Sequence, residues 1–449
     1  MKGQTLLSVV AAAGLVSSSP AKPANGAPQK RATLTAVTAK GNAFWVGNER
    51  FYLRGIDYQP GGSSADKDPL GDPDVCERDI KQFKDLGVNT IRVYSVDNSK
   101  NHDKCMQALS DAGIYLVLDV NTPKYSINRA DPKPSYNTKY LQNVFATVEM
   151  FAKYPNTLAF FSGNEVINEQ KGTEKSAPYV KAVTRDIKNY LNSRGLRKVP
   201  VGYSAADVMS NRMETAMYMN CGTDDMRSDF FAFNDYSWCN SDFTTSGWDQ
   251  KVKNFTDYGL PIFLSEWGCT KSRPRKFEEM GALMSSQMSS VYSGGLMYEY
   301  SVEENKFGIV TLDGDKVTTS DEFDLYRDAL KANPMPTGSG GAASTTHAVA
   351  CPTSDASWSV DPTRVPSMPS EAEKYMKSGA GDGAGFSGDG SQNAEDSGTS
   401  TADVTGGKPS PSSSSQENAG VSMRGPADKG PMAVAALVFA FSLMGALLL

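Results

Sequence analysis

Residues 51–300 alternate between short apolar segments and longer amphipathic ones, and this alternation constrains the fold more than any other feature of the chain. The amphipathic segments have the apolar spacing of helices and lie at 74–86, 102–112, 138–153, 177–192, 248–258 and 275–288. The eight apolar segments are typical of strands and lie at 51–58, 88–94, 114–120, 157–165, 199–205, 230–236, 261–268 and 294–300. Apolar strands separated by helices indicate a parallel sheet, and eight of them predict an α/β fold of the (β/α)8 TIM barrel type.

The sequence on either side of this alternation has a different composition. We expect a barrel domain over 32–333, followed by an extension over 334–369 that is stapled to it through Cys351. Residues 370–418 are rich in Ser, Gly and Pro. Because such a segment can bury little apolar surface, we expect it to form a disordered stalk.

Both termini have the features of processing signals. Lys2 followed by an apolar run and then small residues predicts a secretory signal peptide over 1–21, with a short buried helix as the alternative. Residues 419–449 contain a polar spacer and an uncharged apolar run, which is the order of a GPI-attachment propeptide, with Asn418 as the attachment residue. The alternative is a tail-anchored helix. The first interpretation predicts a cell-surface protein held to the outer leaflet of the plasma membrane by a GPI anchor, or passed on to the cell wall.

Charge and residue usage exclude several functions. The formal net charge is −6 and there is no basic run, so we expect no nucleic-acid partner. The only histidines are His102 and His347, which argues against most zinc sites and histidine-dependent triads. In an exported chain, six cysteines without a CxxC pair predict three disulfides and leave their pairing open. We therefore expect no metal and no cofactor, and chemistry that uses carboxylates and phenols.

Polar and aromatic residues collect at the carboxyl ends of the predicted strands, where a TIM barrel has its active site. They include Asp57, Gln59, Tyr94, Asp119, Asn164, Glu165, Asp207, Tyr236, Glu266 and Tyr298. Aromatic rings that stack on sugars, together with carboxylates and amides that bind hydroxyls, suit a carbohydrate. Glycoside cleavage needs two carboxyl groups, and Glu165 and Glu266 end the fourth and seventh strand segments. A carboxyl separation of roughly 5 to 5.5 Å would make the reaction retaining.

Several motifs carry a family resemblance. "FFSGNEVINE" and "IFLSEWGC" resemble the retaining barrel glycosidases of clan A. With "RGIDYQPGG", "NTIRVYSVD", "FNDYSWC" and "LMYEYS", residues 32–333 resemble the fungal GPI-anchored β-1,3-glucanosyltransferases of glycoside hydrolase family 72. The sequence has no cysteine beyond Cys351, so the resemblance is to members that lack a C-terminal cysteine-rich glucan-binding module.

The resemblance implies roles for individual residues. Glu165 would be the proton donor and base, Glu266 the nucleophile, and Asn164 a donor to the sugar 2-hydroxyl. The residues implied to bind substrate are Gln59, Tyr94, Asp119, Asn164, Asp207, Arg212, Tyr236 and Tyr298. The implied disulfides are Cys76–Cys105, Cys221–Cys351 and Cys239–Cys269.

Alternatives remain for several of these residues. Asp207 and Arg212 could instead pair with each other, and the tyrosines could be ordinary barrel aromatics. Tyr298 could also hold the carboxylate of Glu266 through a hydrogen bond. Glu169 lies four residues beyond Glu165, and we expect it to be peripheral. Asn254 is in the only N-glycosylation sequon.

Three functions are therefore open. The resemblance favours a transferase that cleaves an internal β-1,3-glucan linkage and moves the new reducing end to the non-reducing end of another chain, which elongates cell-wall glucan. Donor and acceptor would both be β-1,3-glucan. The alternatives are an endo-β-1,3-glucanase that only hydrolyses, and an inactive glucan-binding or structural surface protein.

Overall fold

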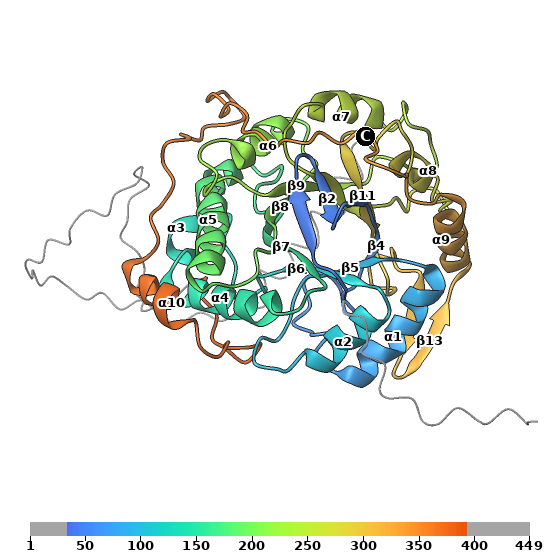
Figure 1. Ribbon diagram of the computed structural model, residues 1–449, viewed down its shortest axis with the longest axis horizontal. Coiled ribbons are helices and arrows are strands. Elements are labelled where there is room, and N and C mark those ends of the chain that lie inside the picture. Colours follow the sequence, from blue (N-terminus) through green and yellow to red (C-terminus); the bar gives the residue numbers. More distant parts are fainter. Residues whose placement is uncertain (1–33, 393–449) are drawn as a thin grey trace, which may run out of the picture. The chain divides into compact units, whose positions relative to one another are not determined.

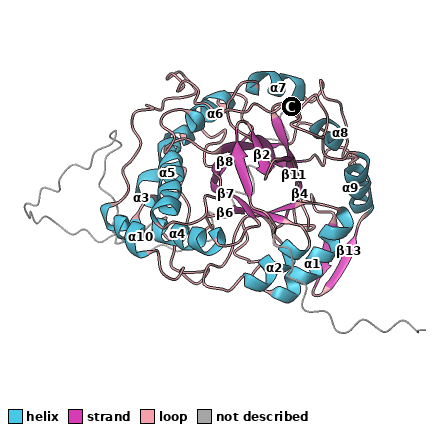
Figure 2. Cartoon of the chain, in the orientation of Figure 1, coloured by secondary structure: helices cyan, strands magenta, loops and turns pink. Residues whose placement is uncertain are grey.

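The computed structural model describes residues 34–392, and its centre is a closed barrel of eight parallel strands (Figures 1 and 2). The strands follow one another around the barrel in the order β10-β11-β4-β5-β6-β7-β8-β9. They are β4 (Leu53–Asp57), β5 (Thr90–Val93), β6 (Tyr115–Asp119), β7 (Thr157–Asn164), β8 (Val201–Ala206), β9 (Phe230–Asp235), β10 (Ile262–Trp267) and β11 (Tyr292–Met297). Each expected strand segment overlaps one of these strands, with β8 ending one residue later and β11 starting two residues earlier than expected, so the predicted TIM barrel is confirmed.

Helices surround the barrel (Figure 2). They are α1 (Pro73–Leu86), α2 (Asp103–Asp111), α3 (Pro132–Ser135), α4 (Thr138–Ala152), α5 (Ala177–Ser193), α6 (Arg212–Asn220), α7 (Trp248–Phe255), α8 (Glu279–Leu283) and α9 (Asp321–Ala332). A 3-10 turn, η1 (Thr173–Ser176), precedes α5, and a two-stranded ribbon, β12 (Val310–Asp313) and β13 (Lys316–Thr319), precedes α9.

The ends of α1 follow directly from its sequence. Asp72 caps the first turn by accepting a hydrogen bond from the backbone N–H of Asp74 at 3.0 Å, and Pro73 starts the helix where no N–H is needed. Gly87 ends it with a φ of 79°, a left-handed conformation that glycine adopts without strain. Between these signals, the apolar side chains of α1 pack into the core, among them Ile80, Phe83 and Leu86.

Helix α8 is shorter than expected. The sequence predicts a helix over 275–288, but α8 covers only Glu279–Leu283. The serine-rich stretch that follows provides a reason: the Ser285 hydroxyl donates to the carbonyl oxygen of Ala282 at 2.8 Å and competes with the helical hydrogen bonds. Helices α6 and α9 were not among the predicted segments.

The amino end of the barrel is closed by the sheet β1 (Val37–Lys40), β2 (Ala43–Val46) and β3 (Glu49–Phe51). Phe44 of β2 packs against Phe230 and Phe263, which lie near the start of β9 and β10, with ring centroids 5.8 and 5.9 Å apart. This apolar cluster fills the bottom of the barrel and leaves the carboxyl ends of the strands for the functional site.

All three implied disulfides are present. Cys76–Cys105 joins α1 to α2, Cys239–Cys269 joins the segments after β9 and β10, and Cys221–Cys351 fastens the extension to the end of α6. The extension is also packed by Trp358, which is fully buried with its ring centroid 5.6 Å from that of Tyr218.

The predicted start of the stalk at residue 370 is wrong. Residues 370–378 form a 3-10 turn, η2 (Ser370–Ala372), and helix α10 (Glu373–Ser378), and Ala372 is fully buried. Residues 379–392 continue along the barrel domain and hydrogen-bond to it. The rest of the predicted stalk, the signal peptide, Asn418 and the GPI propeptide lie outside the described residues. Within 34–392, no helix has the length and apolar character needed to cross a membrane.

Candidate active site

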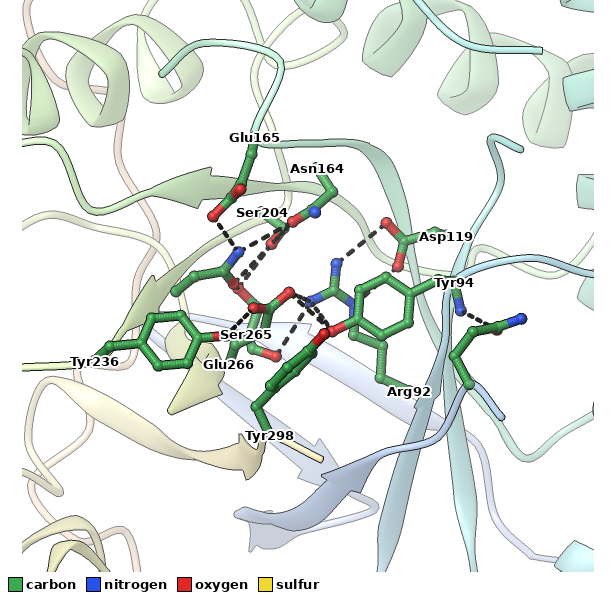
Figure 3. Close-up of polar contacts among 12 residues, drawn as sticks. Arg92, Tyr94, Asp119, Asn164, Glu165, Ser204, Tyr236, Ser265, Glu266 and Tyr298 are labelled. Carbon is green, nitrogen blue, oxygen red and sulfur yellow. Dashed lines mark hydrogen bonds and ion pairs between the residues drawn. The ribbon is translucent and has the colours of Figure 1, made fainter. Parts of the chain in front are cut away.

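The strand ends bring the two predicted catalytic glutamates to one mouth of the barrel (Figure 3). Glu165 directly follows β7, and Glu266 lies near the end of β10. Tyr94, Tyr236 and Tyr298 directly follow β5, β9 and β11. The structure thus gathers around two carboxyl groups residues that are up to about 200 positions apart in the sequence.

The carboxyl group of Glu266 has more hydrogen-bond partners than that of Glu165. Its Oε1 accepts a hydrogen bond from the Tyr94 hydroxyl at 2.8 Å and from Nη1 of Arg92 at 3.1 Å, and its Oε2 accepts one from the Tyr236 hydroxyl. Only 6% of Glu266 is exposed. A carboxyl group that accepts from three donors, one of them a cation, is in an environment that favours its ionised form. The phenol donors to this carboxylate are Tyr94 and Tyr236, and the alternative of a hydrogen bond from Tyr298 is not seen among the described residues.

Arg92 is the main functional residue that the sequence reading missed. It is fully buried, and its Nε and Nη2 donate to the two oxygens of Asp119 at 2.8 and 3.2 Å. Its guanidinium also lies over the ring of Tyr94, 4.1 Å from the centroid. A signal was available: Arg92 is two residues before Tyr94, so both side chains point to the same side of the strand.

Two opposing effects act on the pKa of Glu266. Burial raises this pKa to about 7, the positive charge of Arg92 opposes the rise, and the negative charge of Glu165 adds to it. The hydrogen bonds from Tyr236 and Tyr94 also oppose the rise, and the pKa of about 7 is the balance of all these effects. The charge of Glu165 thus disfavours ionisation of Glu266, and its three hydrogen-bond donors favour it.

Glu165 is held differently. Its Oε1 accepts one hydrogen bond, from Nδ2 of Asn234 at 2.8 Å, and its backbone N–H donates to the carbonyl oxygen of Ser204 at 2.9 Å. Its φ is 48°, a left-handed conformation that costs a residue with a side chain about 1–2 kcal/mol. Such strained positions cluster at functional sites, where the surrounding structure holds them in place.

The amide of Asn164 has a defined orientation. Its Oδ1 accepts from the Ser204 hydroxyl at 2.7 Å and from Nδ2 of Asn234 at 3.3 Å. The Ser265 hydroxyl, 2.8 Å from that of Ser204, donates to Oδ1 of Asn234 at 2.9 Å. With its oxygen occupied, Asn164 has its Nδ2 left to donate. Ser204, Asn234 and Ser265 were also missed, although Asn234 lies two residues before Tyr236 and so faces the same side of its strand.

Gln59 supports the site through the backbone. Its Oε1 accepts from the N–H groups of Tyr94 and Ser95 at 3.1 and 3.2 Å, and its Nε2 donates to the carbonyl oxygen of Lys67 at 2.7 Å. Only 1% of Gln59 is exposed. These contacts fix the position of Tyr94, and direct contact of Gln59 with a substrate stays a prediction.

Asp207 and Arg212 form the ion pair that was kept as an alternative. Nε of Arg212 donates to Oδ1 of Asp207, and Nζ of Lys251 lies 2.7 Å from Oδ2 of the same carboxylate. Lys251 also contacts Asp235, which ends β9. These residues thus form a charged network beside the tyrosines, and their binding role is untested.

The tyrosines at the mouth form an aromatic cluster with Phe307. The rings of Tyr236 and Tyr298 are nearly perpendicular, at 87°, with centroids 6.0 Å apart, and each lies 5.4 Å from the ring of Phe307. Glu169 is exposed and lies in a bend beyond β7, as expected of a peripheral residue. Asn254 is exposed on α7, and its glycosylation stays a prediction.

Comparison with known proteins shows the family. A family model described as "Glucanosyltransferase", of glycoside hydrolase family 72, matches residues 27–333. The chain belongs to this glucanosyltransferase family. The 1,3-beta-glucanosyltransferase gel1 of Aspergillus fumigatus is 61% identical over 360 residues, which cover 80% of this chain and 79% of that relative. The 1,3-beta-glucanosyltransferase GAS5 of Saccharomyces cerevisiae is 50% identical over 80% of this chain and 75% of its own length.

Among solved structures, the chain is similar to a mutant of Saccharomyces cerevisiae Gas2p in complex with laminaritetraose and laminaripentaose. The TM-score is 0.70 at 37% identity, over 76% of each chain. Within the described range 34–392, no group of three or more His, Cys, Asp or Glu residues is placed to hold a metal ion.

Proposed function

We propose that this chain is a retaining β-1,3-glucanosyltransferase that cleaves an internal linkage of one β-1,3-glucan and transfers the new reducing end to the non-reducing end of another. Family membership supports the activity, and relatives named 1,3-beta-glucanosyltransferase support the substrate class. One observation carries the assignment of roles: the two glutamates at the barrel mouth have unequal hydrogen-bond partners.

This asymmetry supports different roles for the two glutamates. Glu266 accepts from Arg92 and two phenols, whereas Glu165 accepts from a single neutral amide. Charge-assisted donors stabilise a carboxylate more than a carboxylic acid. We therefore assign the role of nucleophile to Glu266 and the role of acid to Glu165.

In the first step, an oxygen of Glu266 attacks the anomeric carbon of the donor glucan. The bond from that carbon to the leaving-chain oxygen breaks, and Glu165 gives its proton to this oxygen. The products are a glycosyl ester on Glu266 and a released glucan whose end carries a new hydroxyl. The free Nδ2 of Asn164 is placed to donate to the sugar 2-hydroxyl, a bond that strengthens in the transition state.

In the second step, Glu165, now ionised, takes a proton from the 3-hydroxyl at the non-reducing end of an acceptor glucan. The hydroxyl oxygen attacks the anomeric carbon, the ester bond to Glu266 breaks, and a new β-1,3 linkage forms. Two displacements at the same carbon retain its configuration. Water can replace the acceptor hydroxyl in this step, so an acceptor held against the ester determines whether transfer exceeds hydrolysis.

The test is to incubate the protein with a β-1,3-gluco-oligosaccharide of a single length and to size the products. We expect products longer than the substrate. Shorter products alone would mean hydrolysis only, and an unchanged substrate would refute enzymatic activity. Glu165→Gln and Glu266→Gln are each expected to abolish turnover, and the matched control Glu169→Gln is expected to retain it. Full activity in either of the first two variants would contradict the assigned roles.

We further propose that the protein is exported and held at the cell surface by a GPI anchor attached at Asn418. The supporting observation is the order of sequence features at the two termini. A phospholipase specific for phosphatidylinositol should release the protein from membranes, and removal of residues 432–449 should send it to the medium. Retention of the truncated protein on the membrane would contradict this anchor.

A further inference from the structure

Residues 379–392, named the strap here, leave helix α10 and are fastened first to α4 and α5 (Figure 1, orange). The backbone N–H of Ala380 donates to the hydroxyl of Tyr190 in α5 at 2.9 Å. Nε2 of Gln142 in α4 donates to the carbonyl oxygens of Ala380 and Asp382 at 2.8 and 2.9 Å. The strap therefore begins on the outer helices.

The strap then contacts the loop 94–102, which follows β5. The backbone N–H of Gly385 donates to Oδ1 of Asn98 at 2.9 Å, and Asn98 is only 3% exposed. Nδ2 of Asn98 in turn donates to the Asn143 carbonyl oxygen at 3.0 Å and to the Thr147 hydroxyl at 2.9 Å, both in α4. This asparagine thus joins the strap, the β5 loop and α4.

The last part of the strap is bound to the loop 120–137, which follows β6. Nζ of Lys124 donates to the carbonyl oxygens of Phe386 and Gly388 at 2.7 and 3.3 Å. The Ser391 N–H donates to the Lys124 carbonyl oxygen at 3.0 Å, and Nδ2 of Asn137 donates to that of Ser391 at 2.8 Å. Both ends of the β6 loop are therefore fixed by the strap.

Glycines allow this close approach. A Cβ added at Gly383 would lie 2.0 Å from Oδ1 of Asn98, and one added at Gly388 would lie 2.2 Å from the hydroxyl of Tyr125. Real Cβ atoms do not approach other atoms so closely, so a side chain at either position would push the strap off the loops. The glycine content that predicts disorder by composition is here needed for packing.

The two loops carry supports of the nucleophile. Loop 94–102 begins at Tyr94, which donates to Glu266, and loop 120–137 follows Asp119, which binds Arg92. Asn121, near the start of the second loop, donates from Nδ2 to the carbonyl oxygen of Ser162 in β7 at 3.0 Å. Both loops lie at the carboxyl ends of the strands, where the substrate of a TIM barrel binds.

We propose that the strap is a positioning element of the active site, which holds loops 94–102 and 120–137 in the arrangement that binds an acceptor glucan and so favours transfer over hydrolysis. This inference rests on the proposed transferase function, because only a transferase uses an acceptor. A sugar hydroxyl must be held against the ester by a binding site for the acceptor chain, whereas water is small and abundant and reaches the ester without such a site. Loosening the loops therefore penalises transfer more than hydrolysis.

The test compares full-length Gly383→Ala with the wild-type chain. Hydrogen exchange of residues 94–102 and 120–137 should become faster, and the ratio of transfer to hydrolysis on a single-length β-1,3-gluco-oligosaccharide should fall by about tenfold. The KM for acceptor should rise, and the rate of hydrolysis should fall less than the rate of transfer. Gly381→Asn is the matched control, because nothing lies within 4 Å of an added Cβ there and asparagine tolerates its φ of 69°.

A second variant, Lys124→Met, removes the two side-chain bonds to the strap at an exposed position and should act in the same direction if Gly383→Ala folds poorly. Unchanged exchange in both loops overturns the proposal, and so does faster exchange with an unchanged ratio of transfer to hydrolysis. If the wild-type protein makes only shorter products, the proposed transferase function is refuted instead of the role of the strap. Hydrogen exchange alone would not reveal this outcome, so the two failures can be told apart.

Discussion

Replacing Tyr236 by Phe tests the claim that phenol donors keep Glu266 ionised. The change removes the hydroxyl that donates to Oε2 and leaves the ring in the aromatic cluster with Tyr298 and Phe307. A hydrogen bond to a charged group contributes about 1.5–3 kcal/mol. Its loss therefore makes ionised Glu266 about ten to a hundred times less favourable relative to its protonated form.

The sign of the pH effect follows from the role of Glu266. The nucleophile acts in its ionised form, and burial already raises its pKa to about 7. Activity on the acidic side should thus rise as pH rises through this pKa. Loss of the donor raises the pKa further, so the acidic limb of kcat/KM should move to higher pH in Tyr236→Phe. In Tyr236→Phe, kcat/KM should fall about ten- to a hundredfold at pH values on this limb, and the fall should become smaller at higher pH.

The measurement is kcat/KM against pH on a β-1,3-gluco-oligosaccharide, because this ratio reports groups of the free enzyme. Tyr94→Phe should move the acidic limb in the same direction, since it removes the 2.8 Å bond to Oε1. Tyr298→Phe is the comparison: its hydroxyl accepts from Asn305 at 3.3 Å, so it should alter binding and leave the position of the limb unchanged. An unmoved limb in Tyr236→Phe, or an equal movement in Tyr298→Phe, would refute this reasoning.

Three further changes address stability. Arg92→Met leaves the carboxylate of Asp119 buried without its cation, so it should lower the free energy of unfolding by about 3–5 kcal/mol, measured with urea; a loss below about 1 kcal/mol would contradict the buried pair. Burial lowers the pKa of Lys181 to about 7, so between that pH and about 10 the unfolded chain binds the extra proton and stability should rise with pH by at most about 1.4 kcal/mol per pH unit. Lys181→Met should remove this rise in stability, and the same pH dependence of stability in the variant would contradict a lowered pKa of Lys181. Burial raises the pKa of Glu299 to about 8, so stability should fall as pH rises from about 4.5 to 8; Glu299→Gln should flatten this fall, as thermal unfolding across the range can show.

The barrel and the two glutamates could be predicted because both depend on local order in the sequence. Apolar strands alternate with helices, and in this fold the residue after each strand is at the mouth. Glu165 and Glu266 therefore lie at the predicted mouth, and Glu169, four residues beyond Glu165, is exposed in a bend past β7. Helix lengths were less predictable, since α8 ends where Ser285 bonds to the backbone.

The partners of the glutamates could not be predicted in the same way. Arg92 of β5 meets Glu266 of β10 across the barrel interior, and these strands are not neighbours in the sheet. Periodicity shows that a side chain faces inward but does not show which other inward side chain it meets. The strap was missed for a different reason: composition registers glycine as flexibility, while Gly383 and Gly388 are where the backbone packs against buried side chains.

The charges inside the mouth distinguish Glu266, the proposed nucleophile, from the other buried acids. Arg92 contacts both Asp119 and Glu266, whereas Asp57 is fully buried with no hydrogen-bond partner for either carboxyl oxygen. Burial raises the pKa of Asp57 well above its usual range, and the negative charges of Glu266 and Glu299 raise it further. The positive charge of Arg92 opposes this rise without a hydrogen bond to Asp57, and burial raises the pKa of Glu299 to about 8. Ionisation of either acid would raise the pKa of Glu266 by charge repulsion and so oppose the ionised form that the proposed nucleophile needs.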